Sequence, residues 1–123
     1  MTSTFQKKEK LCHRAIVDKV FAEGSSVKKY PFLLVWYQGP EVKEPFQIAM
    51  SVPKRRVKFA VHRNRLKRKM REAYRRNKHT FLDKVDKPTA AVLVYLDQED
   101  RPLIEMERKI CVLFERFVQD QGK

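Results

Sequence analysis

Thirteen of the 28 lysines and arginines in this chain lie between residues 54 and 78, where Glu72 is the single acid. That segment carries a net charge of +12, against +13 for the whole chain, so the remaining residues are almost neutral. Concentrated positive charge disfavours a compact fold unless anions relieve it, and a polyphosphate does so while releasing condensed counter-ions. The alternative, a basic helix face that is merely solvated, is less favoured because compensating acids are missing.

The basic segment is also amphipathic if it forms a helix from residue 60 onwards. A rotation of about 100° per residue places Leu66, Met70 and Ala73 on one stripe, with Tyr74 at its border. The opposite side and its flank carry cations and one amide: Asn64, Arg65, Lys67, Arg68, Arg71 and Arg75. The planar guanidinium fork suits phosphate oxygens and base edges. The sequence therefore predicts a helix with one core face and one nucleic-acid-binding face.

Side-chain combinations for catalysis are sparse. The three glycines form no phosphate-binding loop, and the cysteines and histidines lack the spacing of a zinc site or of a nucleophile with its base. Asp97, Glu99 and Asp100 could gather a metal ion, but an exposed acidic turn is the favoured interpretation. We therefore expect no catalytic side chain and no metal site, and favour a binding protein over an enzyme that uses its own side chains.

Length and composition indicate one domain spanning residues 1–123, with residues 1–10 flexible. No apolar run approaches the roughly 20 residues of a membrane span, and no secretory signal is evident. Cys12 and Cys111 are expected to be reduced thiols rather than a disulfide. These features predict a cytoplasmic protein.

In the first half of the chain, residues 11–22 are predicted as a helix, with Gly24 as its left-handed C-cap. Residues 25–29 are predicted as a polar connection. Residues 32–37 and 46–52 are predicted as the two strands of a hairpin. In the second of these strands, alternate apolar side chains face one side: Phe46, Ile48, Met50 and Val52.

After the basic helix, the apolar run over residues 90–96 is typical of a strand covered on both faces. A final helix is predicted from a broad apolar stripe, Met106, Ile110, Leu113, Phe114 and Phe117. A short strand over residues 57–59 and a helical continuation or loop over residues 79–87 remain open. The pattern indicates a single two-layer α+β domain with helices packed on a small sheet.

The run over residues 60–74 resembles the signature of the bacterial ribonuclease P protein component. In that family an Arg-Asn-Arg core, here Arg63-Asn64-Arg65, is followed by an apolar residue, Lys-Arg and then Arg-Glu. The preceding Ser-Val-x-Lys-Arg over residues 51–55 and the Val-Phe-x-x-Gly over residues 20–24 are also similar to the family. Two departures are Arg56-Val57-Lys58-Phe59, where the family usually carries a glycine and one residue fewer, and Val17, where an aromatic is common.

The resemblance implies the small subunit of a ribonucleoprotein endonuclease that removes the 5′ leader of precursor tRNA. The catalyst would be the RNA, acting through Mg²⁺. The implied fold is a mixed four-stranded sheet with three helices and a left-handed β-α-β crossover around the basic helix, a hand opposite to the usual one.

The expected RNA contacts are the cations and amide of the basic segment: Lys54, Arg55, Arg56, Lys58, Arg63, Asn64, Arg65, Lys67, Arg68, Arg71 and Arg75. The resemblance also implies a cleft between the first helix and the sheet that holds the single-stranded leader. Its expected lining is Val17, Phe21, Phe32 and Trp36, with Phe46 as a further aromatic candidate. Core packing is the alternative for these aromatics, and the favoured one for Trp36 and Phe46.

Three other classes remain as alternatives. A structural, ribosomal-type RNA-binding protein would share the basic helix without a processing role. A DNA-binding regulator would place that helix in a major groove, although nothing else in the sequence indicates a helix-turn-helix. A protein-only nuclease would cleave without RNA. No obligate protein partner and no membrane association are expected.

Overall fold

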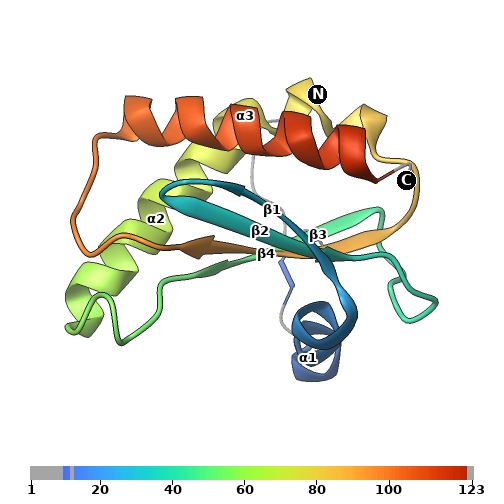
Figure 1. Ribbon diagram of the computed structural model, residues 1–123, viewed down its shortest axis with the longest axis horizontal. Helices are drawn as coiled ribbons and strands as arrows, with labels where there is room; N and C mark the ends of the chain where they lie inside the picture. Colours follow the sequence, from blue (N-terminus) through green and yellow to red (C-terminus); the bar gives the residue numbers. More distant parts are fainter. Residues whose placement is uncertain (1–9, 12, 122–123) are drawn as a thin grey trace.

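One mixed sheet organises the part of the chain that the computed structural model describes, residues 10, 11 and 13–121 (Figure 1). Its four strands are β1 (Ser25–Lys29), β2 (Phe32–Tyr37), β3 (Phe46–Ser51) and β4 (Thr89–Tyr95). They lie in the order β1-β2-β4-β3. The pairs β1–β2 and β2–β4 are antiparallel, whereas β3 and β4 are parallel.

Helices cover both faces of this sheet. Figure 1 shows α1 (Arg14–Glu23) on one face, and α2 (Ala60–Asn77) and α3 (Leu103–Asp120) on the other. The short 3₁₀ turns η2 (Lys78–Thr80) and η3 (Leu82–Lys84) follow α2. The three helices and four strands of the described residues confirm the α+β architecture, but helices on both faces give three layers rather than the predicted two. The crossover β3-α2-β4 is present, and its left-handedness stays a prediction.

The main core lies between the sheet and the pair α2 and α3. Both predicted helical stripes are buried there: Leu66, Met70, Ala73, Tyr74, Met106, Ile110, Leu113, Phe114 and Phe117. The strand predicted over residues 90–96 is confirmed as β4, and all seven of its residues are buried. Its two apolar faces are needed because alternate β4 side chains pack in the main core and in a smaller cluster under α1.

The predicted hairpin between residues 32–37 and 46–52 is wrong, although both strands exist. β2 and β3 each pair with β4 and lie on opposite sides of it. A strand that is apolar on both faces is most stable at the centre of a sheet, and β4 takes that place between two strands that precede it in the chain. The predicted side of β3 is confirmed, because Phe46, Ile48 and Val52 lie in the main core and Met50 packs against it.

The polar connection predicted over residues 25–29 is instead the edge strand β1. β1 pairs with β2 along one edge of the sheet, and Val27 is its one buried residue. An edge strand with a single buried side chain needs no apolar alternation, and its sequence shows none. Gly24 is also not left-handed, since its φ and ψ are −77° and 164°. A Cβ atom there would lie 2.3 Å from the Val20 carbonyl oxygen and 2.6 Å from that of Trp36. Glycine is therefore required by close backbone approach where α1 passes directly into β1.

Three segment boundaries also differ from the predictions. The first helix begins at Arg14, because Leu11 donates its backbone N–H to the Ile48 carbonyl, 3.1 Å away, and Lys10 forms an isolated bridge with Ile48. Lys10 is thus ordered, while residues 1–9 lie outside the described residues. The suggested strand over residues 57–59 is irregular backbone that follows a turn over residues 54–56, in which the Pro53 carbonyl accepts hydrogen bonds from the N–H groups of Arg56 and Val57. Residues 78–84 form the two 3₁₀ turns.

Candidate RNA-binding surface

The apolar stripe of α2 fixes which side of that helix meets solvent. Leu66, Met70, Ala73 and Tyr74 are at most 3% exposed, so the helix cannot rotate without breaking the main core. The predicted contact residues of α2 consequently point outward or lie along the rim of the helix, and the other four precede it, at residues 54–56 and 58. Six are exposed: Lys54, Arg55, Lys58, Asn64, Arg65 and Arg68. Five are half-buried: Arg56, Arg63, Lys67, Arg71 and Arg75. We call these eleven residues the cationic face.

Arg63 differs from its neighbours because it is anchored to the backbone. Its guanidinium donates to the Val57 carbonyl at 3.0 Å and to the Lys58 carbonyl at 2.7 Å. Val57 is itself buried in the main core. Arg63 therefore holds the turn before α2 against the first helical turn, and its charge faces two carbonyl dipoles rather than open solvent alone.

Towards the C-terminal end of α2, the cationic face contains one internal ion pair. Arg75 donates to the Glu72 carboxylate, and this hydrogen bond, together with the charge of Arg75, lowers the pKa of Glu72 despite partial burial. Arg76 also pairs with Glu107 of α3, with Nε and Oε1 3.5 Å apart. The uncompensated cations are therefore concentrated in the first two-thirds of the helix.

The acidic turn between β4 and α3 lies against the basic helix. Asp100 pairs with Lys69, Nζ to Oδ1 2.7 Å, and with Arg65, Nε to Oδ2 3.3 Å. Burial alone would raise the pKa of Asp100, but the hydrogen bond and charge of Lys69 and the charge of Arg65 hold it below its usual range. The turn thus neutralises part of the cationic face.

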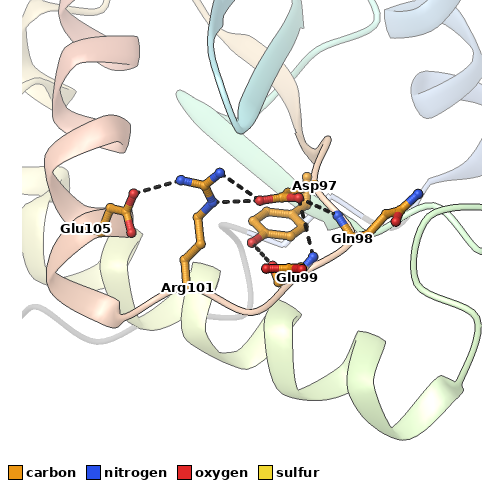
Figure 2. A network of polar contacts seen from close by, with 6 residues as sticks. Asp97, Gln98, Glu99, Arg101 and Glu105 are labelled. Carbon is orange, nitrogen blue, oxygen red and sulfur yellow. Dashed lines mark hydrogen bonds and ion pairs between the residues drawn. The ribbon is translucent and has the colours of Figure 1, made fainter.

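Arg101 fastens this turn to α3. Figure 2 shows its guanidinium between Asp97 and Glu105, with nitrogen-to-oxygen distances of 2.7 Å to both carboxylates. Asp97 also accepts backbone hydrogen bonds from Gln98 at 2.7 Å and Glu99 at 3.4 Å (Figure 2). The carboxylates of Asp97 and Asp100 are therefore engaged with arginine, lysine and backbone donors, which supports the interpretation of a salt-bridged acidic turn.

Two hollows lie beside the cationic face. Both are lined by Lys10, which the sequence did not indicate as a contact residue. One, of about 200 Å³, is lined by Lys10, Leu11, Ile48, Ala49, Met50, Lys67 and Arg71. The other, of about 420 Å³, is lined by Lys10, Arg68, Arg71, Glu72 and Arg75. Lys10 joins both because its bridge to Ile48 brings it next to α2. Nothing in the polar N-terminal sequence distinguished Lys10 from its neighbours.

The predicted leader-binding residues are divided between the two faces of the sheet. Val17 packs against the cluster under α1, and Phe21 on the same helix is 54% exposed. Phe32 is fully buried and Trp36 is 7% exposed, and both lie in the main core on the opposite face. The assignment of Phe32 and Trp36 to a cleft beside α1 is therefore wrong.

The alternation of β2 explains this error. Side chains of a strand alternate between faces, so Phe32, Leu34 and Trp36 point one way and the odd-numbered residues between them the other. Phe32 packs edge-on against Tyr95, with ring centroids 5.5 Å apart, and Trp36 against Phe117 at 5.1 Å. Phe46, the further aromatic candidate, is likewise a core residue, 6% exposed. The β2 residues that pack with the α1 cluster are Leu33, Val35 and Tyr37.

Among the described residues, no group of three or more His, Cys, Asp or Glu side chains is placed to hold a metal ion. Cys111 is a free, half-buried thiol whose pKa is raised by burial, and Cys12 lies outside the described residues. No helix in residues 10, 11 and 13–121 is long and apolar enough to cross a membrane.

A family model described as Ribonuclease P matches residues 5–117, so this chain belongs to the ribonuclease P protein family. A relative named "Ribonuclease P protein component" from Porphyromonas gingivalis is 41% identical over 83 residues, which cover 67% of this chain and 61% of the relative. The protein of the same name from Chlorobium phaeobacteroides is 36% identical over 89 residues, covering 68% and 60%. The match thus spans about three-fifths of the length of these curated relatives.

Solved structures show the same fold. The RNase P protein from Thermotoga maritima has a TM-score of 0.68 and 24% identity, covering 88% of this chain and 96% of that one. An RNase P protein from Staphylococcus aureus has a TM-score of 0.70 and 18% identity, covering 89% and 94%. The resemblance carried by the Arg-Asn-Arg motif is therefore confirmed at the level of family and fold.

Proposed function

We propose that this chain is the protein subunit of a ribonuclease P and that it binds the catalytic RNA of that enzyme through the cationic face. The observation that carries the proposal is the outward presentation of Asn64, Arg65 and Arg68 on a helix whose other side is locked in the core. The first turn of α2 has no acidic residue and no side-chain cap, so its backbone N–H groups add donors to those of the side chains.

The proposed place for the 5′ leader of precursor tRNA is the α1 side of the sheet, next to β3. The hollow of about 200 Å³ lies at the β3 edge of the sheet, where Leu11 and Ala49 of the cluster under α1 meet cations that include Lys67 and Arg71 of α2. Phe21 adds an exposed ring on α1. An aromatic surface with cations that follow a phosphate backbone is the usual way in which proteins hold single strands.

In this proposal the phosphodiester is cleaved by the catalytic RNA with Mg²⁺, which supplies Lewis-acid and nucleophile-activating chemistry. The described residues offer no carboxylate cluster that fits a Mg²⁺ ion, so the metal is assigned to the RNA. The chain contributes affinity and position: the cationic face orients the catalytic RNA, and the α1 side retains the leader. A cytoplasmic location remains a prediction.

Reconstitution tests the proposal. The full chain is mixed with a bacterial ribonuclease P RNA and precursor tRNA at low Mg²⁺, and the 5′ end of the product is mapped. We expect cleavage at the mature 5′ end that requires the RNA and is faster with the chain than without it. Cleavage by the chain alone would establish a protein-only nuclease. RNA binding with no stimulation of cleavage would instead favour a structural RNA-binding protein.

A further inference from the structure

We infer that Phe59 is a stacking platform for one unpaired base, placed where the polypeptide enters α2. The Phe59 side chain is 60% exposed, and Val61 beside it is 70% exposed. The inference rests on the proposed function, since it assigns a base contact to the RNA whose phosphates the cationic face binds. It concerns a residue outside both surfaces described above.

Hydrogen bonds fix the backbone that carries the Phe59 ring. The Phe59 carbonyl accepts the first hydrogen bonds of the helix, from the backbone N–H groups of His62 and Arg63, each at 3.1 Å. The preceding carbonyls, of Val57 and Lys58, are fixed by the Arg63 guanidinium. Val57 is anchored in the core. An aromatic on an ordered backbone loses little conformational entropy when a ligand stacks on it, and this favours binding.

The surroundings of the ring select the ligand. His62 packs edge-on against Phe59, with centroids 5.9 Å apart and planes at 81°, and Lys58 Nζ lies 5.8 Å from the ring centre. From Lys54 to Arg65 the sequence holds six lysines and arginines and no acid. An exposed aromatic ring among cations complements a ligand with a flat π-surface and a negative charge. A nucleotide has both, whereas a lipid tail or an apolar peptide lacks the charge next to the ring.

The position of Phe59 in the chain also favours a nucleotide ligand. Phe59 is the N-cap of α2 and lies four residues, about one helical turn, before Arg63 of the Arg-Asn-Arg motif. A strand whose phosphates contact Asn64 and Arg65 could therefore place a neighbouring base over this ring. Lys58 would then meet the phosphate attached to that base. Duplex RNA keeps its bases paired and stacked, so the platform requires a loop, bulge or single strand.

The test compares a 12-nucleotide oligoadenylate with an abasic phosphodiester of the same length, using the full chain at fixed salt. We expect wild type to prefer the oligoadenylate. Phe59→Ala should reduce affinity for it by about fivefold to about a hundredfold, with affinity for the abasic strand unchanged. Phe59→Trp should keep the preference. Val61→Ala is the matched control, because it removes exposed apolar surface from the second residue of α2. This variant should also keep the preference for the oligoadenylate.

Several outcomes would overturn the inference. If Phe59→Ala retains the full preference for bases, the platform is wrong while phosphate binding stands. If wild type binds neither strand, the platform is wrong, and the reconstitution with the catalytic RNA decides separately whether the proposed function stands. If Phe59→Ala changes the solution mass of the chain and leaves RNA affinity intact, Phe59 belongs to a contact between copies. Melting temperatures of all variants are measured in parallel. Because the Phe59 ring is exposed, we expect the variants to melt at the same temperature as wild type.

Discussion

Individual arginines of the cationic face differ in what they contribute to the free protein. Arg63 is tied to two carbonyls and Arg65 to Asp100, whereas Arg68 is exposed and lines an open hollow. Of these three, Arg68 is therefore the arginine whose removal should affect folding least while still weakening RNA binding. The sequence predicted that these side chains face away from the core because a single helical periodicity determines both sides of α2.

Arg68→Ala should weaken binding to the catalytic RNA by about 1–3 kcal/mol, the range of a charge-assisted hydrogen bond. Arg108→Ala is the matched control, because Arg108 is also an exposed arginine on an 18-residue helix but lies on α3. Its RNA affinity should remain near that of wild type. Affinities by filter binding and melting temperatures by calorimetry are compared for the two variants. Equal loss of affinity in both would show that only total charge matters.

Phe21 and Phe32 should respond in opposite ways to truncation. Phe32→Ala removes a fully buried ring from the main core and should cost about 3–5 kcal/mol of folding free energy. Phe21→Ala removes a half-exposed ring and should change stability far less, while weakening precursor tRNA relative to mature tRNA by about 1–3 kcal/mol per stacked base. Denaturant unfolding and both tRNA affinities are measured in the reconstituted complex. Equal losses for the two tRNAs at unchanged stability would exclude Phe21 from a leader-binding surface.

At the scale of elements, the acidic turn and the basic helix form one electrostatic unit. Asp100 competes with phosphate for Arg65 and Lys69, because a carboxylate and a phosphate oxygen use the same donors. The Arg101 bridges in Figure 2 keep this turn in place.

Asp100→Asn should therefore bind RNA about two- to fivefold more tightly, the scale of an exposed ion pair. The control is Glu99→Gln, which removes the same charge from the neighbouring residue without breaking an ion pair to α2. Affinities of both variants for the catalytic RNA are determined at low salt. A gain of equal size in both would mean that Asp100 acts through net charge and not through its pairing with α2.

Elements with a strong local pattern were predicted correctly, and those defined by long-range pairing were not. α3 and β4 could be read from their own apolar residues. β1 could not, because an edge strand that buries only Val27 has no alternation to detect. The pairing of β3 with β4 joins strands separated by α2, and local turn signals favoured a hairpin instead. Phe32 and Trp36 were assigned to the wrong face for the same reason. The alternation of a strand divides its side chains between two faces, but it does not identify the face that α1 covers.

For the whole molecule, the division of charge is the central feature. The segment over residues 54–78 carries nearly all of the net charge, and the fold attaches that segment to the core by one side only. The remainder of the chain serves as an almost neutral scaffold that presents the cationic face. Phosphate neutralisation by α2 and the turn before it should therefore supply most of the affinity for RNA.

The dependence of RNA affinity on salt tests this claim most directly. The dissociation constant of the full chain for a bacterial ribonuclease P RNA is measured from 50 to 200 mM monovalent salt at constant Mg²⁺. If the cationic face contacts roughly six or more phosphates, affinity should fall by about three orders of magnitude over that range. Arg68→Ala should reduce the log–log slope by about 1, and Arg108→Ala should leave it unchanged. A dissociation constant that barely moves with salt would contradict the account.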